Sequence, residues 1–122
     1  MAARLANRIA LVRCELVPAG NPDLSCPPGL SAAALAAHAA IVELLVARGT
    51  TYTGGCRAFY SPAQWRERGE RHCQQALLVL VHDGGDVGDY CNYDREDYDA
   101  IEALSTALRP CGLYVENATS CY

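Results

Sequence analysis

Lysine is missing from this chain: all of its 10 basic residues are arginine, and they face 14 acidic residues, which gives a formal net charge of −4 at pH 7. Surfaces that bind duplex nucleic acid need clustered cations, so this class of partner is not expected. The chain also lacks a run of eighteen apolar residues, which argues against a membrane span and a membrane partner. Arg4, Arg8 and Arg13 interrupt the apolar N-terminus, so no signal peptide is predicted and a cytoplasmic protein is expected.

The sequence signatures of common cofactor and metal sites are absent as well. The seven cysteines form no Cys-x-x-Cys pair, so a zinc ribbon or knuckle is not expected. An odd number of cysteines without a signal peptide argues against a disulfide framework, and most are expected to be small buried residues. Walker, Rossmann and EF-hand spacings do not occur. We therefore predict no cofactor and no metal centre.

What the chain does contain is enough apolar residues for one core, since 51% of its 122 residues are hydrophobic. A single domain covering residues 1–122 is expected. Alternating apolar residues predict a strand over residues 8–17, and further strands are predicted at 50–60 and 113–122. The continuous apolar run within residues 76–85 predicts a central strand that is covered on both faces.

Three helices are predicted between these strands. The clearest runs from Ser31, a favourable N-cap, to Arg48, with Gly49 as a stop. It is apolar on two sides, and His38 on one of them is interpreted as a hydrogen-bonded core histidine rather than a ligand. The second helix is expected from Ser61 to about residue 75, and the third from near Asp94 to residue 109. The fold class is α/β or α+β, with a small mixed sheet of about four strands and three helices.

The first candidate site is the segment TGGCRAFYSPAQW. Gly54 and Gly55 can expose backbone N–H groups, and Arg57 supplies a fork of donors for an anion. Tyr60 and Trp65 supply faces for stacking, so a small anionic ligand such as a nucleotide is expected. The alternative is a bulged strand with ordinary core aromatics. Arg57→Ala is expected to abolish ligand binding with little change in melting temperature.

The second candidate is HDGGD, at the end of the apolar run. Asp83 follows that run directly, and the glycines beside it allow a ligand or another backbone to come close. Asp83 and Asn92 are expected to complete the ligand site if this segment and TGGCRAFY are neighbours. Asp83, with Asp86 and Asp89, is also a possible divalent-cation site, against the simpler interpretation of a turn that precedes a helix.

Two other kinds of function remain open. Cys56 with His72 or His82 and Asp83 would make a Cys-His-Asp arrangement for a small hydrolase, although the spacing does not support it. Residues 83–99 contain seven acids interleaved with tyrosines, which is suited to binding a partner protein. For that surface, the alternative is a solvated helix start. Catalysis is expected less than binding, and self-association is possible.

The segments GGCRAFYSPAQWRERGE, LVLVHDGGD and GLYVENATSCY resemble small uncharacterised proteins of phages and prophages over residues 50–122. The resemblance implies a protein that acts by binding in the host cytoplasm, as inhibitors of bacterial defence and sponges for nucleotide signals do. It assigns no role to any residue.

Overall fold

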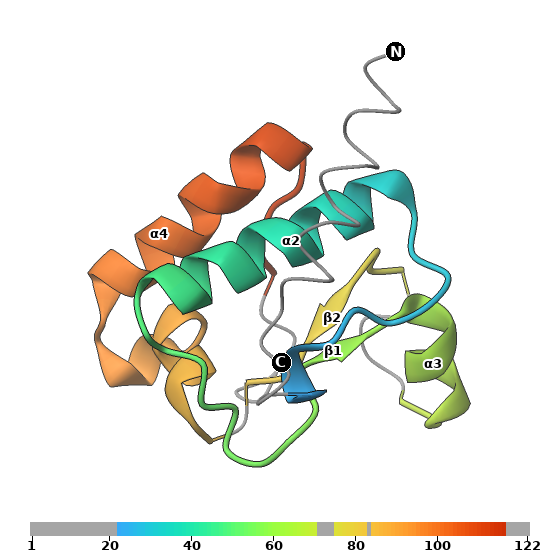
Figure 1. The fold of residues 1–122 in the computed structure, drawn as a ribbon, viewed down its shortest axis with the longest axis horizontal. Coiled ribbons are helices and arrows are strands. Elements are labelled where there is room, and N and C mark those ends of the chain that lie inside the picture. Colours follow the sequence, from blue (N-terminus) through green and yellow to red (C-terminus); the bar gives the residue numbers. More distant parts are fainter. Residues whose placement is uncertain (1–21, 71–74, 83, 117–122) are drawn as a thin grey trace.

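The computed structural model describes residues 22–70, 75–82 and 84–116 (Figure 1). The elements in chain order, with η for a 3-10 helix, are η1 (Pro22–Leu24), α2 (Ala32–Ala47), β1 (Phe59–Tyr60), α3 (Pro62–Glu67), β2 (Val79–Leu80), η2 (Asp86–Tyr90), η3 (Tyr93–Arg95), α4 (Tyr98–Leu108) and η4 (Arg109–Cys111). The expected mixture of helices and strands is confirmed. No helix in the described ranges has the length and hydropathy of a membrane span.

Helix α2 begins and ends where the sequence predicts. The Ser31 hydroxyl oxygen accepts a hydrogen bond from the Ala34 N–H at 3.2 Å, which satisfies one of the free donors of the first turn. Gly49, with φ of 68°, turns the chain away after Arg48. The helix then lies across α4, and the two helices pack against each other (Figure 1).

The core lies between these helices and the strand pair. It contains apolar side chains from α2, β1, η2 and α4, together with neighbouring loop residues; the buried members are Leu24, Ala37, Ile41, Val42, Leu45, Ala58, Phe59, Val87, Tyr90, Cys91, Ala100, Leu104 and Leu108. Each fully buried aliphatic or aromatic side chain contributes about 1.5–3 kcal/mol relative to exposure. The wide apolar surface of α2 is therefore buried within the protein's own core.

His38 is a core histidine, as expected. Its ring is fully buried, and Nε2 lies 2.9 Å from the Leu24 carbonyl oxygen, to which a neutral ring donates. Its ring meets the Phe59 ring edge-on, with 4.4 Å between centroids. Burial lowers the pKa of His38, against the opposing effect of hydrogen bonds to the backbone at Leu24 and Ser25. The side chain therefore fixes η1 onto α2.

The prediction of a four-stranded mixed sheet is wrong for the described residues, which form a two-stranded antiparallel sheet. Phe59 pairs with Leu80, and Tyr60 pairs with Val79. Strand β1 is short because Gly54 and Gly55, with φ of 75° and 79°, form a turn inside the predicted strand 50–60. A two-stranded sheet has no central strand, so the apolar run of residues 76–82 is covered only in part and Leu77 is exposed.

Helix α3 is shorter than predicted, since it ends at Glu67 rather than near residue 75. Gly69, with φ of 79°, follows directly and breaks the helical turn. Its start is as expected: Ser61 and Gln64 form a reciprocal capping box, with Pro62 in the first turn.

Helix α4 begins four residues later than predicted. Asp97, not Asp94, is its N-cap, and the Asp97 carboxylate accepts from the Ala100 N–H at 3.1 Å. Before it, Asn92 caps the separate turn η3 by accepting from the Asp94 N–H at 2.9 Å. Glu96 stands between them in the left-handed conformation, with φ of 57°, which prevents one continuous helix.

Two other predicted strands lie wholly or partly outside the described residues. The strand over residues 8–17 lies outside the described residues. Of the predicted strand 113–122, residues 113–116 have no regular structure and the remainder is likewise outside the described ranges.

Candidate functional site

The first candidate segment forms a cluster of two arginines and two aromatic rings at the start of α3, here called the arginine–aromatic cluster: Arg57, Tyr60, Trp65 and Arg68. Arg57 Nε donates to the Phe59 carbonyl oxygen at 2.8 Å, and one Nη donates to the side-chain oxygen of Gln64. That Gln64 oxygen also accepts from the Ser61 N–H at 3.1 Å. Arg57 is therefore attached to the capping box of α3.

The rings of this cluster are covered by guanidinium groups. The Arg57 guanidinium lies 4.3 Å and that of Arg68 5.0 Å from the centre of the Tyr60 ring. Arg68 is also 4.9 Å from the Trp65 ring, which meets Tyr60 at 5.3 Å between centroids. Trp65 is only 1% exposed, so its expected role in stacking on a ligand is corrected to that of a core residue. Half-buried Tyr60 already stacks on the protein's own arginines.

The two glycine-containing segments do lie side by side, but backbone fills the space between them. A Cβ placed on Gly85 would lie 2.4 Å from the Gly54 nitrogen and 2.6 Å from the Tyr52 oxygen. The Asp86 N–H donates to that same Tyr52 oxygen at 2.7 Å, and the Asp86 carboxylate accepts from the Tyr52 N–H at 3.3 Å. Gly85 of HDGGD therefore has a structural cause: it lets two stretches of main chain pack together.

The remaining members of the expected ligand site do not join the cluster. Asn92 uses its side-chain oxygen to cap η3, as described above. Gly55 lies in the turn before Cys56 and is exposed. Asp83 lies outside the described residues. The structure thus brings together Arg57, Tyr60 and Trp65, and separately Gly54 with the segment after Asp83.

The second candidate region is an exposed stretch, Tyr93–Asp99, which we call the acidic tyrosine surface. All seven of its residues are exposed, with Tyr93 at 59% and Tyr98 at 62%. Four are acids and one, Arg95, is basic. Two large rings therefore stand in water beside carboxylates, which is the arrangement that a protein-binding surface needs.

Some acids here have structural partners within the described residues, and others do not. Asp97 caps α4, and Asp99 pairs with Arg48 at 3.3 Å. Asp94 and Glu96 have no side-chain hydrogen bond or ion pair among the described residues. Glu96 is also the single non-glycine residue with positive φ there. The Glu96 backbone ends η3 as its C-cap, so helix capping leaves unexplained only the side-chain charges of Asp94 and Glu96.

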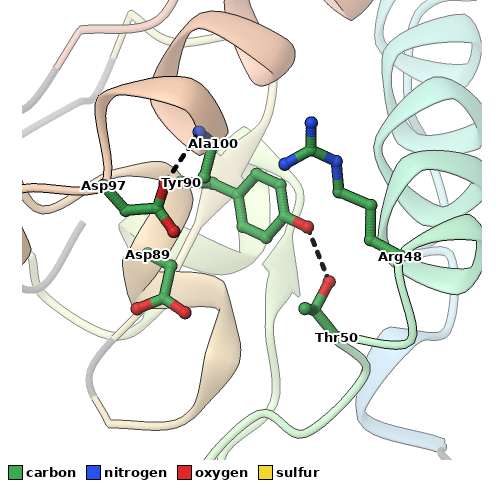
Figure 2. A pocket seen from close by; sticks show the side chains of 6 residues that line it. All are labelled: Arg48, Thr50, Asp89, Tyr90, Asp97 and Ala100. Atoms are coloured by element: carbon green, nitrogen blue, oxygen red, sulfur yellow. Dashed lines mark hydrogen bonds between the residues drawn. The ribbon is translucent and has the colours of Figure 1, made fainter.

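A pocket of about 360 Å³ opens beside this surface, between the end of α2 and the start of α4 (Figure 2). It is lined by Arg48, Thr50, Asp89, Tyr90, Asp97 and Ala100. The sequence reasoning missed this pocket. The sequence predicts that one helix ends at Arg48 and that another starts near Asp94, but no pattern in the sequence indicates that these two ends meet.

The arrangements for other chemistry are only partly within the described residues. Cys56 is exposed and His82 is buried, while His72 and Asp83 lie outside the described ranges. Cys91 is buried, and desolvation raises the pKa of its thiol to about 12, which keeps it protonated. Across residues 22–70, 75–82 and 84–116, no group of three or more His, Cys, Asp or Glu residues is placed to hold a metal ion.

Comparison of the chain with family models, with curated proteins and with solved structures gave no match.

Proposed function

We propose that the protein is a non-catalytic binding protein whose acidic tyrosine surface docks onto a basic segment of a partner protein. The observation that carries the proposal is that all seven residues of Tyr93–Asp99, including two tyrosines, are exposed. Tyrosine rings contribute contact area at a low cost in conformational entropy, and nearby carboxylates attract cationic side chains.

The charge of the wider region supports the same partner chemistry. Residues 86–99 hold six acids and one arginine, and the whole chain carries −4. Such a field increases the association rate of a basic partner and disfavours acidic ones. The resemblance to phage and prophage proteins suggests that the partner is a host protein in the host cytoplasm, which would make this a counter-defence factor.

The test uses Asp94 and Glu96, the two acids of this surface whose side chains have no partner among the described residues. The double variant Asp94→Arg/Glu96→Arg should bind a fluorescent arginine-rich peptide at least about tenfold more weakly than the wild type, measured by anisotropy. Asp97 is left unchanged because its carboxylate caps α4. The melting temperature of the variant should stay close to that of the wild type.

A second double variant, Glu67→Arg/Glu116→Arg, provides the matched control. Both of these acids are exposed, and both lie outside residues 86–99. The control makes the same change in net charge, so it should bind the peptide nearly as well as the wild type. Equal weakening by both double variants would show that net charge alone attracts the peptide, and undiminished binding by the first would disprove the proposal.

A second candidate function, binding of a small anion, is favoured by the two guanidinium groups that converge on Tyr60. Among the described residues, Arg68 has one ion-pair partner, Glu70, at 3.6 Å. A phosphate group could bridge Arg57 and Arg68 without displacing the hydrogen bond to Phe59. A nucleotide base would need another stacking surface, since Tyr60 is already covered.

Trp65, the chain's single tryptophan, provides the measurement for this candidate. Titration with inorganic phosphate or adenosine monophosphate should change its fluorescence saturably, and Arg68→Gln should remove the change. Arg109→Gln, an exposed arginine on η4, should leave it intact. A fluorescence response that persists in Arg68→Gln would contradict anion binding at this cluster.

A further inference from the structure

The pocket between α2 and α4 has a cation on one wall and two carboxylates on the other. Figure 2 shows Arg48 on one side of the Tyr90 ring and Asp89 and Asp97 on the other. We propose that this pocket binds a small zwitterion of the amino-acid class, with its carboxylate on Arg48 and its ammonium group on Asp97 and Asp89. The inference does not rest on the proposed docking function, although Asp97 belongs both to the pocket and to the acidic tyrosine surface.

The carboxylate end of the ligand is set by Arg48. Its one ion-pair partner in the described part of the chain is Asp99, at 3.3 Å, and the Asp99 carboxylate is 88% exposed. An ion pair of this kind contributes little, because water screens it. The Arg48 guanidinium also lies 5.9 Å from the centre of the Tyr90 ring, at the edge of the pocket. Its remaining N–H groups fit the two oxygens of a carboxylate.

The ammonium end is set by two carboxylates that are held in place by the backbone or by Arg95. Asp97 uses one oxygen to accept from the Ala100 N–H, and Asp89 uses one to accept from Arg95 Nη1 at 3.1 Å. Each carboxylate retains a second oxygen for a ligand. Arg95 itself is fixed by its bond to the Gly85 carbonyl oxygen, at 2.6 Å, so Asp89 is preorganised.

The floor of the pocket is polar and ordered. The Thr50 hydroxyl lies 2.7 Å from the Tyr90 hydroxyl and 3.3 Å from the Leu45 carbonyl oxygen. Since that carbonyl can only accept, the consistent arrangement has Tyr90 donating to Thr50 and Thr50 donating to Leu45. Tyr90 is 3% exposed, so its ring is held in a fixed position on the floor of the pocket.

This distribution of charge selects the class of ligand. A simple anion would be attracted by Arg48 but repelled by Asp89 and Asp97. A simple cation would be attracted by the two carboxylates but repelled by Arg48. A molecule with both charges a few bonds apart satisfies both walls at once. The volume of about 360 Å³ is at the lower end of small-molecule pockets, which suits a free amino acid.

The experiment is a titration of the full chain with L-alanine. Binding is measured by calorimetry and by the amide signal of Ala100 in 1H–15N spectra. We expect saturable binding and a shift of the Ala100 signal, because its N–H is bonded to Asp97. N-acetyl-L-alanine lacks the ammonium group and L-alaninamide lacks the carboxylate. Each should bind at least about tenfold more weakly than L-alanine.

Three variants connect the result to the pocket. Arg48→Gln should weaken L-alanine binding at least about tenfold, and so should Asp97→Asn, in which asparagine retains the capping oxygen of α4. Arg109→Gln removes the same charge as Arg48→Gln from an exposed position on η4 and should bind normally. The absence of saturable binding to the wild type would overturn the proposal. So would equal affinity of L-alanine and L-alaninamide, or equal losses in Arg48→Gln and Arg109→Gln.

Discussion

The arginine–aromatic cluster and the acidic tyrosine surface are built from the same kinds of residue, charges beside rings, yet they use them in opposite ways. In the cluster, Arg57 hydrogen-bonds to Phe59 and Gln64 and lies on Tyr60. In the acidic tyrosine surface, Tyr93 and Tyr98 are more than half exposed, and Glu96 has no side-chain partner among the described residues. The comparison teaches that a charged side chain near an aromatic residue in the sequence indicates a contact. The sequence does not show whether that contact is made within the protein itself or with a binding partner.

The same comparison reverses an expectation from the sequence. The sequence predicts a helix start near Asp94, which would account for the acids there, and it makes HDGGD a candidate ligand site. In the structure, Gly85 and Asp86 of HDGGD pack against Tyr52 and Gly54. It is Asp94 and Glu96 that capping does not account for, because α4 is capped by Asp97.

The largest effect is expected for Gly85→Ala, which would break the junction between the two glycine-containing segments. Gly85 has φ of 82° and ψ of −172°, a region open almost only to glycine, and a Cβ there would lie 2.4 Å from backbone. We expect a loss of about 3 kcal/mol or more in the free energy of unfolding, measured by urea denaturation.

Gly84→Ala is the control for that experiment. Gly84 also has positive φ, 75°, but a Cβ there would meet nothing within 4 Å. Its cost should be limited to backbone strain, about 1 kcal/mol. If both variants lose the same free energy of unfolding, the close backbone approach at Gly85 does not contribute to stability.

A smaller loss of stability is expected for Arg57→Ala. This variant tests whether the arginine–aromatic cluster stabilises the fold. The sequence alone predicted little change in melting temperature. The contacts to Phe59, Gln64 and Tyr60 now predict a loss of about 1–2 kcal/mol, because removing the guanidinium leaves the Phe59 carbonyl and the α3 capping box without their partner. Thermal denaturation measures it.

Arg57→Lys keeps the charge but not the fork of donors, so it should recover only part of that stability. Arg68→Ala should cost less than Arg57→Ala, since Arg68 contributes ring contacts and one exposed ion pair. A melting temperature of Arg57→Ala equal to that of the wild type would show that Arg57 is free to serve a ligand, as the sequence indicated.

The smallest effect is expected for Glu96→Gly, in the acidic tyrosine surface. Glu96 has φ of 57°, which glycine adopts without a steric cost, so the variant should be more stable by up to about 1 kcal/mol. Glu96→Gln removes the charge but keeps the strain and should leave stability unchanged. A destabilised Glu96→Gly variant would mean that the Glu96 side chain has a structural role.

The parts of the fold that could be predicted are those fixed by neighbours in sequence. Ser31 and Gly49 bound α2, and Ser61 with Pro62 starts α3, because these residues act on backbone groups within one helical turn. More strands were predicted than the described residues contain, because strand pairing depends on residues that are distant in sequence. An apolar or alternating run shows that a segment is partly buried, but pairing depends on a second segment. The turn at Gly54 and Gly55, both with positive φ, lies before β1 and keeps the earlier part of the predicted strand 50–60 out of the sheet.

The candidate sites also differ in whether their residues are close together or far apart in the sequence. Sequence analysis selected Arg57, Tyr60 and Trp65, and the structure does bring them together, because they lie within nine positions of one another. It gave no indication of the pocket between Arg48 and Asp97, whose residues belong to the ends of two different helices.

The sequence by itself determined the helix starts at Ser31 and Ser61, the apolar surface of α2, the excess of acid in the C-terminal part and three residues of the arginine–aromatic cluster, Arg57, Tyr60 and Trp65. These properties depend on local backbone chemistry and on composition. Only the tertiary structure decided which charges face solvent, which are used internally and which meet across a pocket. Those outcomes depend on how α2 packs against α4, and that packing is set by the shape and volume of the whole core rather than by any short stretch of the chain.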